Sequence, residues 1–191
     1  MGQMGRRLAL DREANQQSAL GVRINANVFE NAELLAKSFH ILHITGEQGI
    51  ELGRVVRHKM TKELQKYYEP VDFLANDMIA AYNWADIVVS RAGMNSLCEL
   101  AALSKPAIVI PLPSSTNAHQ LKNAQYLAKQ GAIRLFEQKD LKGLALVNEI
   151  SKLADDKQAL SYLGESLHKF FRPSAALDIA RLIEQAAREG E

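Results

Sequence analysis

The feature that most constrains the fold is the alternation of short apolar runs with longer amphipathic stretches along most of the chain. The run Ile108-Val109-Ile110 is apolar at consecutive positions, which is typical of strands covered on both faces. The expected strands are 39–45, 71–74, 86–89, 107–111 and 132–136. The expected helices lie near 26–37, 49–66, 77–84, 95–103, 117–130, 139–154, 157–170 and 174–188. This order predicts an α/β fold with a Rossmann-like, doubly wound parallel sheet, in which ligands bind beyond the carboxyl ends of the strands.

The first 20 residues do not follow this pattern. A domain of this type normally opens with an apolar strand and a glycine-rich turn. The run from Arg6 to Arg12 is short and charged, so it is not expected to form a buried central strand. We therefore expect residues 1–20 to be an irregular or disordered lead-in, and residues 21–191 to form one domain.

Composition excludes several classes of protein. The 191 residues suffice for one domain with a substantial core, and the net charge of +1 gives no electrostatic reason to expect a nucleic-acid partner. Cys98 is the only cysteine, so an internal disulfide is excluded and a small buried side chain is expected. The five histidines show no paired spacing for a metal site. No apolar run approaches the roughly 20 residues that cross a bilayer, and no secretion signal is evident, so a cytoplasmic protein is expected, with peripheral membrane contact left open.

Residues 90–99 join an expected strand to an expected helix and read Ser-Arg-Ala-Gly-Met-Asn-Ser-Leu-Cys-Glu. A strand that ends in a glycine turn and opens onto a helix gathers free N–H groups and the positive end of the helix dipole, which suits an anion such as phosphate. Gly93 is expected to supply a positive φ or a close approach of the backbone. Ser96 and Glu99 also match the spacing of a capping box, so each of the two residues could serve either in helix capping or in ligand binding.

Arg91 lies in the same loop and has two interpretations. Its guanidinium could hold a phosphate, or it could pair with Asp86 or Glu99 as structural support.

A second polar group follows the expected strand 107–111. Two prolines stiffen the exit of that strand, and His119, Gln120 and Asn123 lie within about one turn of the next helix. These three side chains could present polar groups to a bound sugar. The alternative is that His119 and Asn123 bond to nearby backbone and position the loop.

A third segment, residues 71–78, runs from a short strand through a loop into a helix. The backbone of Phe73 and Leu74 could bind the edge of a base, which needs only an N–H and a C=O. The alternative is a core strand followed by a side-chain cap at Asn76 or Asp77.

Taken in order, these segments resemble the C-terminal, nucleotide-sugar-binding half of the family 28 glycosyltransferases. The resemblance covers about residues 20–190 and is most specific from 71 to 138. The matching residues are Asp77, Met78, Ala81, Tyr82, Ala85, Asp86, Ser90, Arg91, Ala92, Gly93, Glu99, Leu100, Ala101, Lys105, Pro106, Pro111, Pro113, His119, Gln120, Asn123, Ala124, Gly131 and Ala132. Upstream, His43, Ile44, Thr45, Gly46, Ile24 and Asn25 also look like family positions.

This resemblance implies the donor-binding half of a two-domain (GT-B) glycosyltransferase that transfers GlcNAc from UDP-GlcNAc to the lipid-linked acceptor of peptidoglycan synthesis, lipid I to lipid II. It implies that Leu74 offers its backbone to the uracil and that Glu99 holds the ribose hydroxyls. It implies a diphosphate and ribose lining of Met94, Asn95 and Ser96, and sugar contacts from Gln120 with His119. It implies no metal and no cofactor, and it would place membrane contact at the inner face of the cell membrane.

Two departures from the family shape the expected function. The acceptor-binding N-terminal domain, which carries the expected catalytic base, is not in this chain, so the catalytic residues are unknown and an acceptor domain or partner subunit would be needed. The family's Gly-Gly-Ser-x-Gly loop is reduced to Ser18-Ala19-Leu20-Gly21. The alternatives are a non-catalytic or degenerate nucleotide-sugar binding module, and a different sugar-nucleotide enzyme on the same fold.

Overall fold

The computed structural model describes residues 5–10, 22–74, 77–113 and 119–189. Its centre is a six-stranded sheet with the order β3-β2-β1-β4-β5-β6, and each neighbouring pair is parallel. The predicted doubly wound α/β fold is therefore confirmed. The direction of strand addition reverses between β1 and β4, and in such sheets the carboxyl ends of the two strands at this point border the ligand-binding crevice.

Most elements fall where the periodicity places them. The strands are β1 (Arg6–Leu10), β2 (Phe39–Ile44), β3 (Tyr68–Val71), β4 (Ile87–Ser90), β5 (Ala107–Val109) and β6 (Arg134–Leu135). The helices are α1 (Val22–Ala36), α2 (Ile50–Lys59), α3 (Met78–Trp84), α4 (Met94–Ala102), α5 (His119–Lys129), α6 (Ala145–Asp155), α7 (Lys157–His168) and α8 (Ala175–Glu189), with short 3-10 turns η1 (Leu64–Tyr67) and η3 (Gln138–Asp140). The single helix expected over 49–66 is wrong, because α2 ends at Lys59 and the chain passes through η1 into β3.

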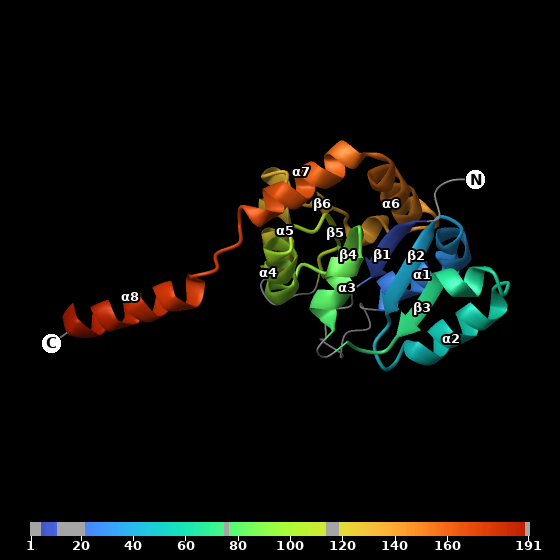
Figure 1. The fold of residues 1–191 in the computed structure, drawn as a ribbon, viewed down its shortest axis with the longest axis horizontal. Helices are drawn as coiled ribbons and strands as arrows, with labels where there is room; N and C mark the ends of the chain where they lie inside the picture. The colour runs from blue at the N-terminus through green and yellow to red at the C-terminus, as the bar shows by residue number, and fades with distance from the viewer. Residues whose placement is uncertain (1–4, 11–21, 75–76, 114–118, 190–191) are drawn as a thin grey trace.

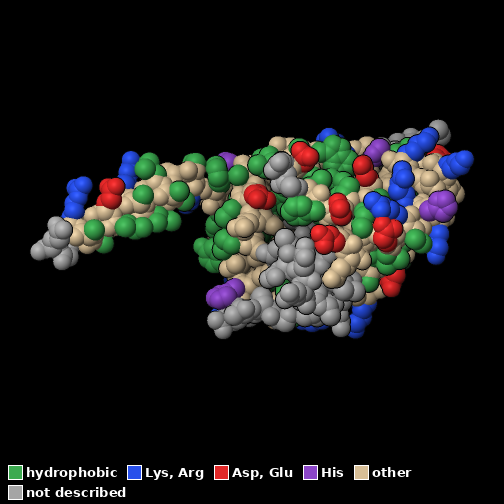
Figure 2. Space-filling view, turned by 90° about the horizontal axis from the view of Figure 1, so that it is seen from below, with side chains coloured by type: hydrophobic (Ala, Val, Ile, Leu, Met, Phe, Trp, Pro, Cys, Tyr) green, Lys and Arg blue, Asp and Glu red, His purple; other side chains and the backbone are tan. Residues whose placement is uncertain are grey.

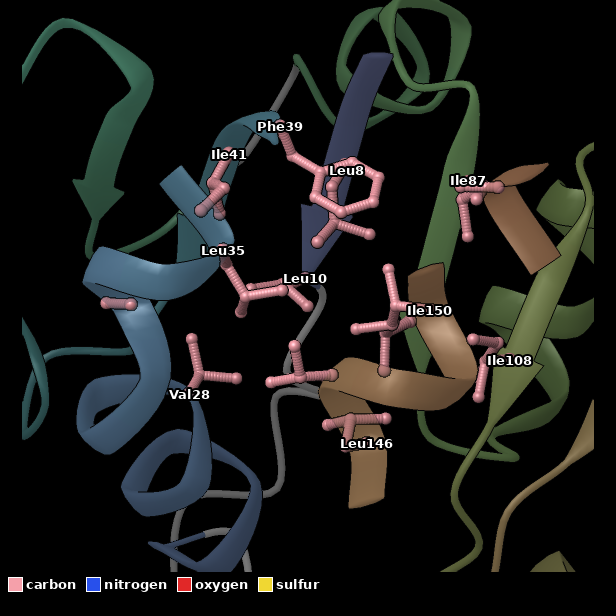
Figure 3. Close-up of a cluster of buried hydrophobic side chains, with 14 of the residues drawn as sticks. Leu8, Leu10, Val28, Leu35, Phe39, Ile41, Ile87, Ile108, Leu146 and Ile150 are labelled. Atoms are coloured by element: carbon pink, nitrogen blue, oxygen red, sulfur yellow. The ribbon is translucent and has the colours of Figure 1, made fainter. Parts of the chain in front are cut away.

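Helices cover both faces of the sheet (Figure 1). On one face, α1 and α6 pack against side chains of alternate strand positions, and Figure 3 shows this cluster with Val28 and Leu35 on one side of Leu10 and Ile150 on the other. On the other face, α3, α4, α5 and the end of α7 enclose a second cluster that contains Ala9 of β1. Because consecutive residues of β1 enter opposite clusters, this strand is a buried central strand.

The prediction that residues 1–20 hold no strand is wrong for Arg6–Leu10. β1 pairs with both β2 and β4, and its last three residues are buried. The charged residues that argued against a strand, Arg6 and Arg7, are the first two residues of β1. Arg7 donates from its backbone N and from its Nη2 to the carboxylate of Asp86, at 2.8 and 2.9 Å, and its guanidinium stacks over Trp84. The side-chain contacts with Asp86 raise the pKa of Arg7. The expected worn loop at residues 18–21 lies outside the described residues.

Helix α8 extends away from the rest of the molecule (Figure 1). Its apolar side chains are exposed, and Leu177, Ile179, Leu182 and Ile183 are each more than half accessible. An amphipathic helix that buries neither face in its own domain has a surface suited to a partner. Among the described residues, no helix has the length and apolarity that crossing a bilayer requires.

Candidate functional site

The three predicted loops meet at one edge of the sheet. In Figure 1 the arrowheads of β2 and β3 point to the lower edge of the molecule, and Figure 2 views the molecule from that side. The loops after β3, β4 and β5 all begin there, since parallel strands end at the same edge. The candidate site therefore lies where the topology of the sheet favours ligand binding.

Helix α4 begins one residue after the glycine of the β4–α4 loop. The N-cap is Gly93, with φ −67° and ψ 142°, and it makes no side-chain capping bond. The prediction of a positive φ at Gly93 is therefore wrong, since this extended conformation suits any residue, and the alternative, a close approach of the backbone at Gly93, stays a prediction. The first-turn N–H groups of Met94, Asn95 and Ser96 point out of the helix start, as the anion-site argument requires.

This helix start excludes the capping-box interpretation of Ser96 and Glu99. A capping box needs the hydroxyl residue at the N-cap and the acid three residues later, but Gly93 is the N-cap and Ser96 lies inside the first turn. Glu99 lies one turn further along the same helix face as Ser96, and its side chain is half-buried. Cys98, expected to be buried, is exposed and borders a hollow between α4 and α5.

Arg91 is buried and binds the loop that follows β5. Its Nη1 donates to the Gln138 side-chain oxygen at 2.8 Å and to the Ile110 carbonyl at 3.1 Å, with Pro111 at the 3.5 Å limit. The carboxylate of Asp86, one of its expected partners, is instead bound by Arg7. These contacts indicate that Arg91 joins the β4 and β5 loops to each other, while a phosphate contact from Arg91 stays a prediction.

The second predicted group lies at the start of α5. Gln120 accepts a hydrogen bond from the Leu112 backbone N at 3.0 Å, so its side-chain oxygen holds the exit of β5 against the helix. His119 is the first residue of α5 and is exposed, and Asn123 is half-buried one turn later. The structure thus places all three residues in the first two turns of α5, and their contacts with a sugar stay predictions.

The third predicted group borders a cavity beside α3. Leu74 is partly buried and lines a hollow of about 410 Å³, together with Asp77 and Trp84 of the α3 region and His40 of β2. Asp77 is the N-cap of α3 but makes no side-chain capping bond, so the expected cap is not found at this residue; Asn76 lies outside the described residues. The backbone contact of Leu74 with a base stays a prediction.

The sequence reasoning missed a buried polar network under the β2–α2 loop. The His43 ring lies 2.9 Å from the Tyr68 hydroxyl and 3.2 Å from the Asn25 side-chain oxygen, and the Asn25 amide donates to the Thr45 carbonyl. Burial lowers the pKa of His43 to about 3 and raises the pKa of Tyr68. The ring is therefore neutral and holds the loop by hydrogen bonds alone. The sequence signal that could have predicted this network was a polar residue at a buried position of β2, His43, and another of α1, Asn25.

No group of three or more His, Cys, Asp or Glu side chains in the described ranges could hold a metal ion.

Comparisons with known proteins agree with these features. The family model described as "Glycosyltransferase family 28 C-terminal domain" matches residues 18–178. In Geobacter sulfurreducens, a UDP-N-acetylglucosamine–N-acetylmuramyl-(pentapeptide) pyrophosphoryl-undecaprenol N-acetylglucosamine transferase is 33% identical, over 91% of this chain and 47% of its own. The enzyme of the same name from Solidesulfovibrio magneticus is 41% identical, over 63% of this chain and 33% of its own. The chain thus spans between a third and a half of the length of these curated relatives.

Solved structures share the fold. The crystal structure of Acinetobacter baumannii MurG superimposes with a TM-score of 0.75 at 21% identity, over 94% of this chain and 49% of that one. The Staphylococcus aureus MnaA–UDP structure gives a TM-score of 0.66 at 14% identity, over 97% of this chain and 47% of that one. Since the family model covers most of the chain, from just before α1 into α8, the protein belongs to the glycosyltransferase family 28 C-terminal domain family.

Proposed function

We propose that this chain binds UDP-GlcNAc at the carboxyl edge of its sheet and serves as the donor-binding part of an enzyme that transfers GlcNAc to a lipid-linked acceptor. The observation that carries the proposal is the start of α4, where three first-turn N–H groups and the positive helix end face the edge that also carries Glu99 and Gln120. The names of the relatives add the donor, UDP-N-acetylglucosamine, and the acceptor, an N-acetylmuramyl-(pentapeptide) pyrophosphoryl-undecaprenol.

In this proposal each residue has a distinct role. The α4 N–H groups hold the diphosphate, and Glu99 accepts hydrogen bonds from the ribose hydroxyls. The Leu74 backbone binds the uracil edge beside the α3 cavity. His119, Gln120 and Asn123 approach the sugar. Arg91 acts by positioning the loops rather than by contact, because its Nη1 is already bound to buried oxygen atoms.

We propose further that the acceptor site and the catalytic base belong to a second half, in a longer parent protein or in a partner subunit. The exposed apolar stripe of α8 supports this, since a 15-residue helix is marginal in water unless its apolar face is buried. In this proposal the transfer takes place at a membrane surface, because the acceptor is lipid-linked, and the family resemblance points to the cytoplasmic face. The non-catalytic binding module stays the alternative. The worn loop at residues 18–21 that favours it lies outside the described residues, whereas the first strand, which was expected to be absent, is present as β1.

The donor site can be tested by calorimetric titration of UDP-GlcNAc into wild type, Glu99→Ala and a matched control, Glu165→Ala. Glu165 is an exposed carboxylate on α7 that accepts a hydrogen bond from Ser161. We expect Glu99→Ala to weaken binding by about tenfold or more, as the loss of a charge-assisted hydrogen-bond pair would. The control should bind like wild type. Equal affinity of all three, or no binding by any, would contradict the assigned pocket.

Turnover separates the enzyme from the binding module. UDP release is measured with UDP-GlcNAc and a polyprenyl-diphosphate sugar acceptor, with and without an acceptor-binding half from a relative. Release that requires the added half supports the divided enzyme. Binding without release in every combination supports the module.

A further inference from the structure

A directed chain of hydrogen bonds runs through the buried polar network under the β2–α2 loop. The Asn25 amide nitrogen donates to the Thr45 carbonyl at 2.8 Å, so the Asn25 side-chain oxygen is the atom that faces His43. That oxygen can only accept, so the His43 Nε2 carries the proton, and the Nδ1 accepts from the Tyr68 hydroxyl at 2.9 Å. The chain therefore runs in one direction, from the Tyr68 hydroxyl to the Thr45 carbonyl.

This chain of hydrogen bonds ends on the peptide between Thr45 and Gly46. The carbonyl of that peptide accepts from Asn25, and its N–H, on Gly46, donates to the Asp72 carbonyl at 2.9 Å. The C=O and N–H of a trans peptide lie in one plane and point in opposite directions, so a partner that fixes one end aims the other. A Cβ at Gly49, the N-cap of α2, would lie 2.7 Å from the Thr45 oxygen, so the start of α2 covers this end of the peptide. The buried side chains therefore set where the Gly46 N–H points.

The Gly46 N–H holds the chain where it leaves β3. Strands β2 and β3 lie side by side (Figure 1), and the bond from Gly46 to Asp72 continues their pairing beyond Val71, the last residue of β3. Leu74 comes two residues after Asp72 and lines the cavity beside α3. Because only one residue separates Asp72 from Leu74, the position of the Leu74 backbone depends on this hydrogen bond.

We propose that His43 is a positioning residue for the base of the donor and that it makes the site prefer uracil to cytosine. Uracil presents an oxygen acceptor beside an N–H donor, whereas cytosine presents an amino donor beside a nitrogen acceptor at the same positions. A backbone N–H and C=O that are held in place therefore match one base and oppose the other. His43 itself is buried, so it acts on the donor only through the chain of hydrogen bonds. The inference rests on the proposed function, since it concerns the same donor site and the backbone of Leu74.

The test is calorimetric titration of the full chain with UDP and with CDP, and the readout is the ratio of the two affinities. Wild type should favour UDP by about tenfold or more, which is what a pair of hydrogen bonds to a base edge gives. His43→Phe keeps a ring but removes both ring nitrogens, so its ratio should fall to about threefold or less. His43→Gln carries an acceptor and a donor on one carboxamide, so it should restore the ratio to within about twofold of wild type.

Two further variants separate positioning from stability. Ile150→Val removes one methyl group from the buried cluster on α6, so it lowers stability without touching the chain of hydrogen bonds and should keep the wild-type ratio. Gly49→Ala presses a Cβ against the Thr45 oxygen and should lower the ratio although His43 is intact. Thermal melting shows which variants are folded at the temperature of the titration.

A wild-type ratio in folded His43→Phe would overturn the inference, and Gly49→Ala decides in the same way if His43→Phe does not fold. A lowered ratio in Ile150→Val would also overturn it, since lost stability alone would then explain the result. In these cases wild type still prefers UDP to CDP, so the proposed donor site stands. Wild type that binds neither nucleotide, or both equally, would contradict the base contact of the donor site and this inference with it.

Discussion

Arg91→Met should destabilise the protein strongly, because it removes a buried cation that joins two loops of the site. The Nη1 atom donates to Gln138 at 2.8 Å and to the Ile110 carbonyl at 3.1 Å, and both of these residues are buried. Each buried acceptor that loses its donor costs about 1–3 kcal/mol, so the loss of two should lower the free energy of unfolding by about 2–6 kcal/mol. Methionine keeps an apolar stem of similar length, so little of this loss comes from a cavity.

Urea unfolding followed by circular dichroism measures the effect. Arg91→Lys retains one charged donor and should lose less than Arg91→Met. The control Arg134→Met removes a half-exposed arginine paired with Glu149 and should cost less than about 1 kcal/mol. UDP-GlcNAc affinity should fall along with stability, because the loop that opens onto α4 is no longer fixed. Unchanged stability with lost UDP-GlcNAc affinity would refute this reasoning and make Arg91 a direct phosphate ligand.

Three further outcomes follow from other contacts. Burial lowers the pKa of His43 to about 3, against 6.5 in the unfolded chain, so the unfolded state takes up the proton first as pH falls. The stability that depends on neutral His43 is complete above about pH 6.5, and between there and pH 3 the free energy of unfolding falls by up to about 1.4 kcal/mol per pH unit. Melting curves recorded across this pH range should show this fall in wild type and in the control His58→Gln, and a smaller fall in His43→Gln. Gly93→Ser supplies a capping oxygen, so it should raise stability by a few tenths of a kcal/mol and weaken UDP binding by calorimetry, whereas Gly93→Ala, with no oxygen, should give no such gain. Leu182→Asp should abolish co-purification of this chain with an acceptor-binding half, while Glu184→Ala on the same helix should not, and equal capture of both would contradict the role of α8.

The sequence predicted the fold well because the apolar periodicity of a doubly wound sheet is a local signal. It failed at β1, where two arginines precede only three buried residues. The burial of a central strand depends on its neighbours β2 and β4, which are distant in sequence. The pairing of Arg7 with Asp86 neutralises the charge that the local pattern counted against a strand.

The site was predicted in outline because each of its loops directly follows a strand. The side-chain roles were harder, since they depend on contacts between loops. Nothing near Arg91 in sequence indicates Gln138, which comes from η3 and reaches the site through the fold. Helix starts were also ambiguous, because a serine and a glycine three residues apart are both acceptable N-caps. Because Gly93 is the N-cap of α4, the spacing of Ser96 and Glu99 does not form a capping box and instead places both residues on one face of the helix.

The contacts that shape the donor edge are internal to this domain. Arg91 joins the β4 and β5 loops, Gln120 holds Leu112, and His43 fixes the β2–α2 loop through buried partners. A site whose supports lie within one domain needs no second half to acquire its shape, so nucleotide binding should precede assembly. Transfer is different, because it needs an acceptor and a base at the reacting carbon. The exposed apolar stripe of α8 then links donor binding to transfer, since these side chains would be buried only when the half that supplies the acceptor is docked.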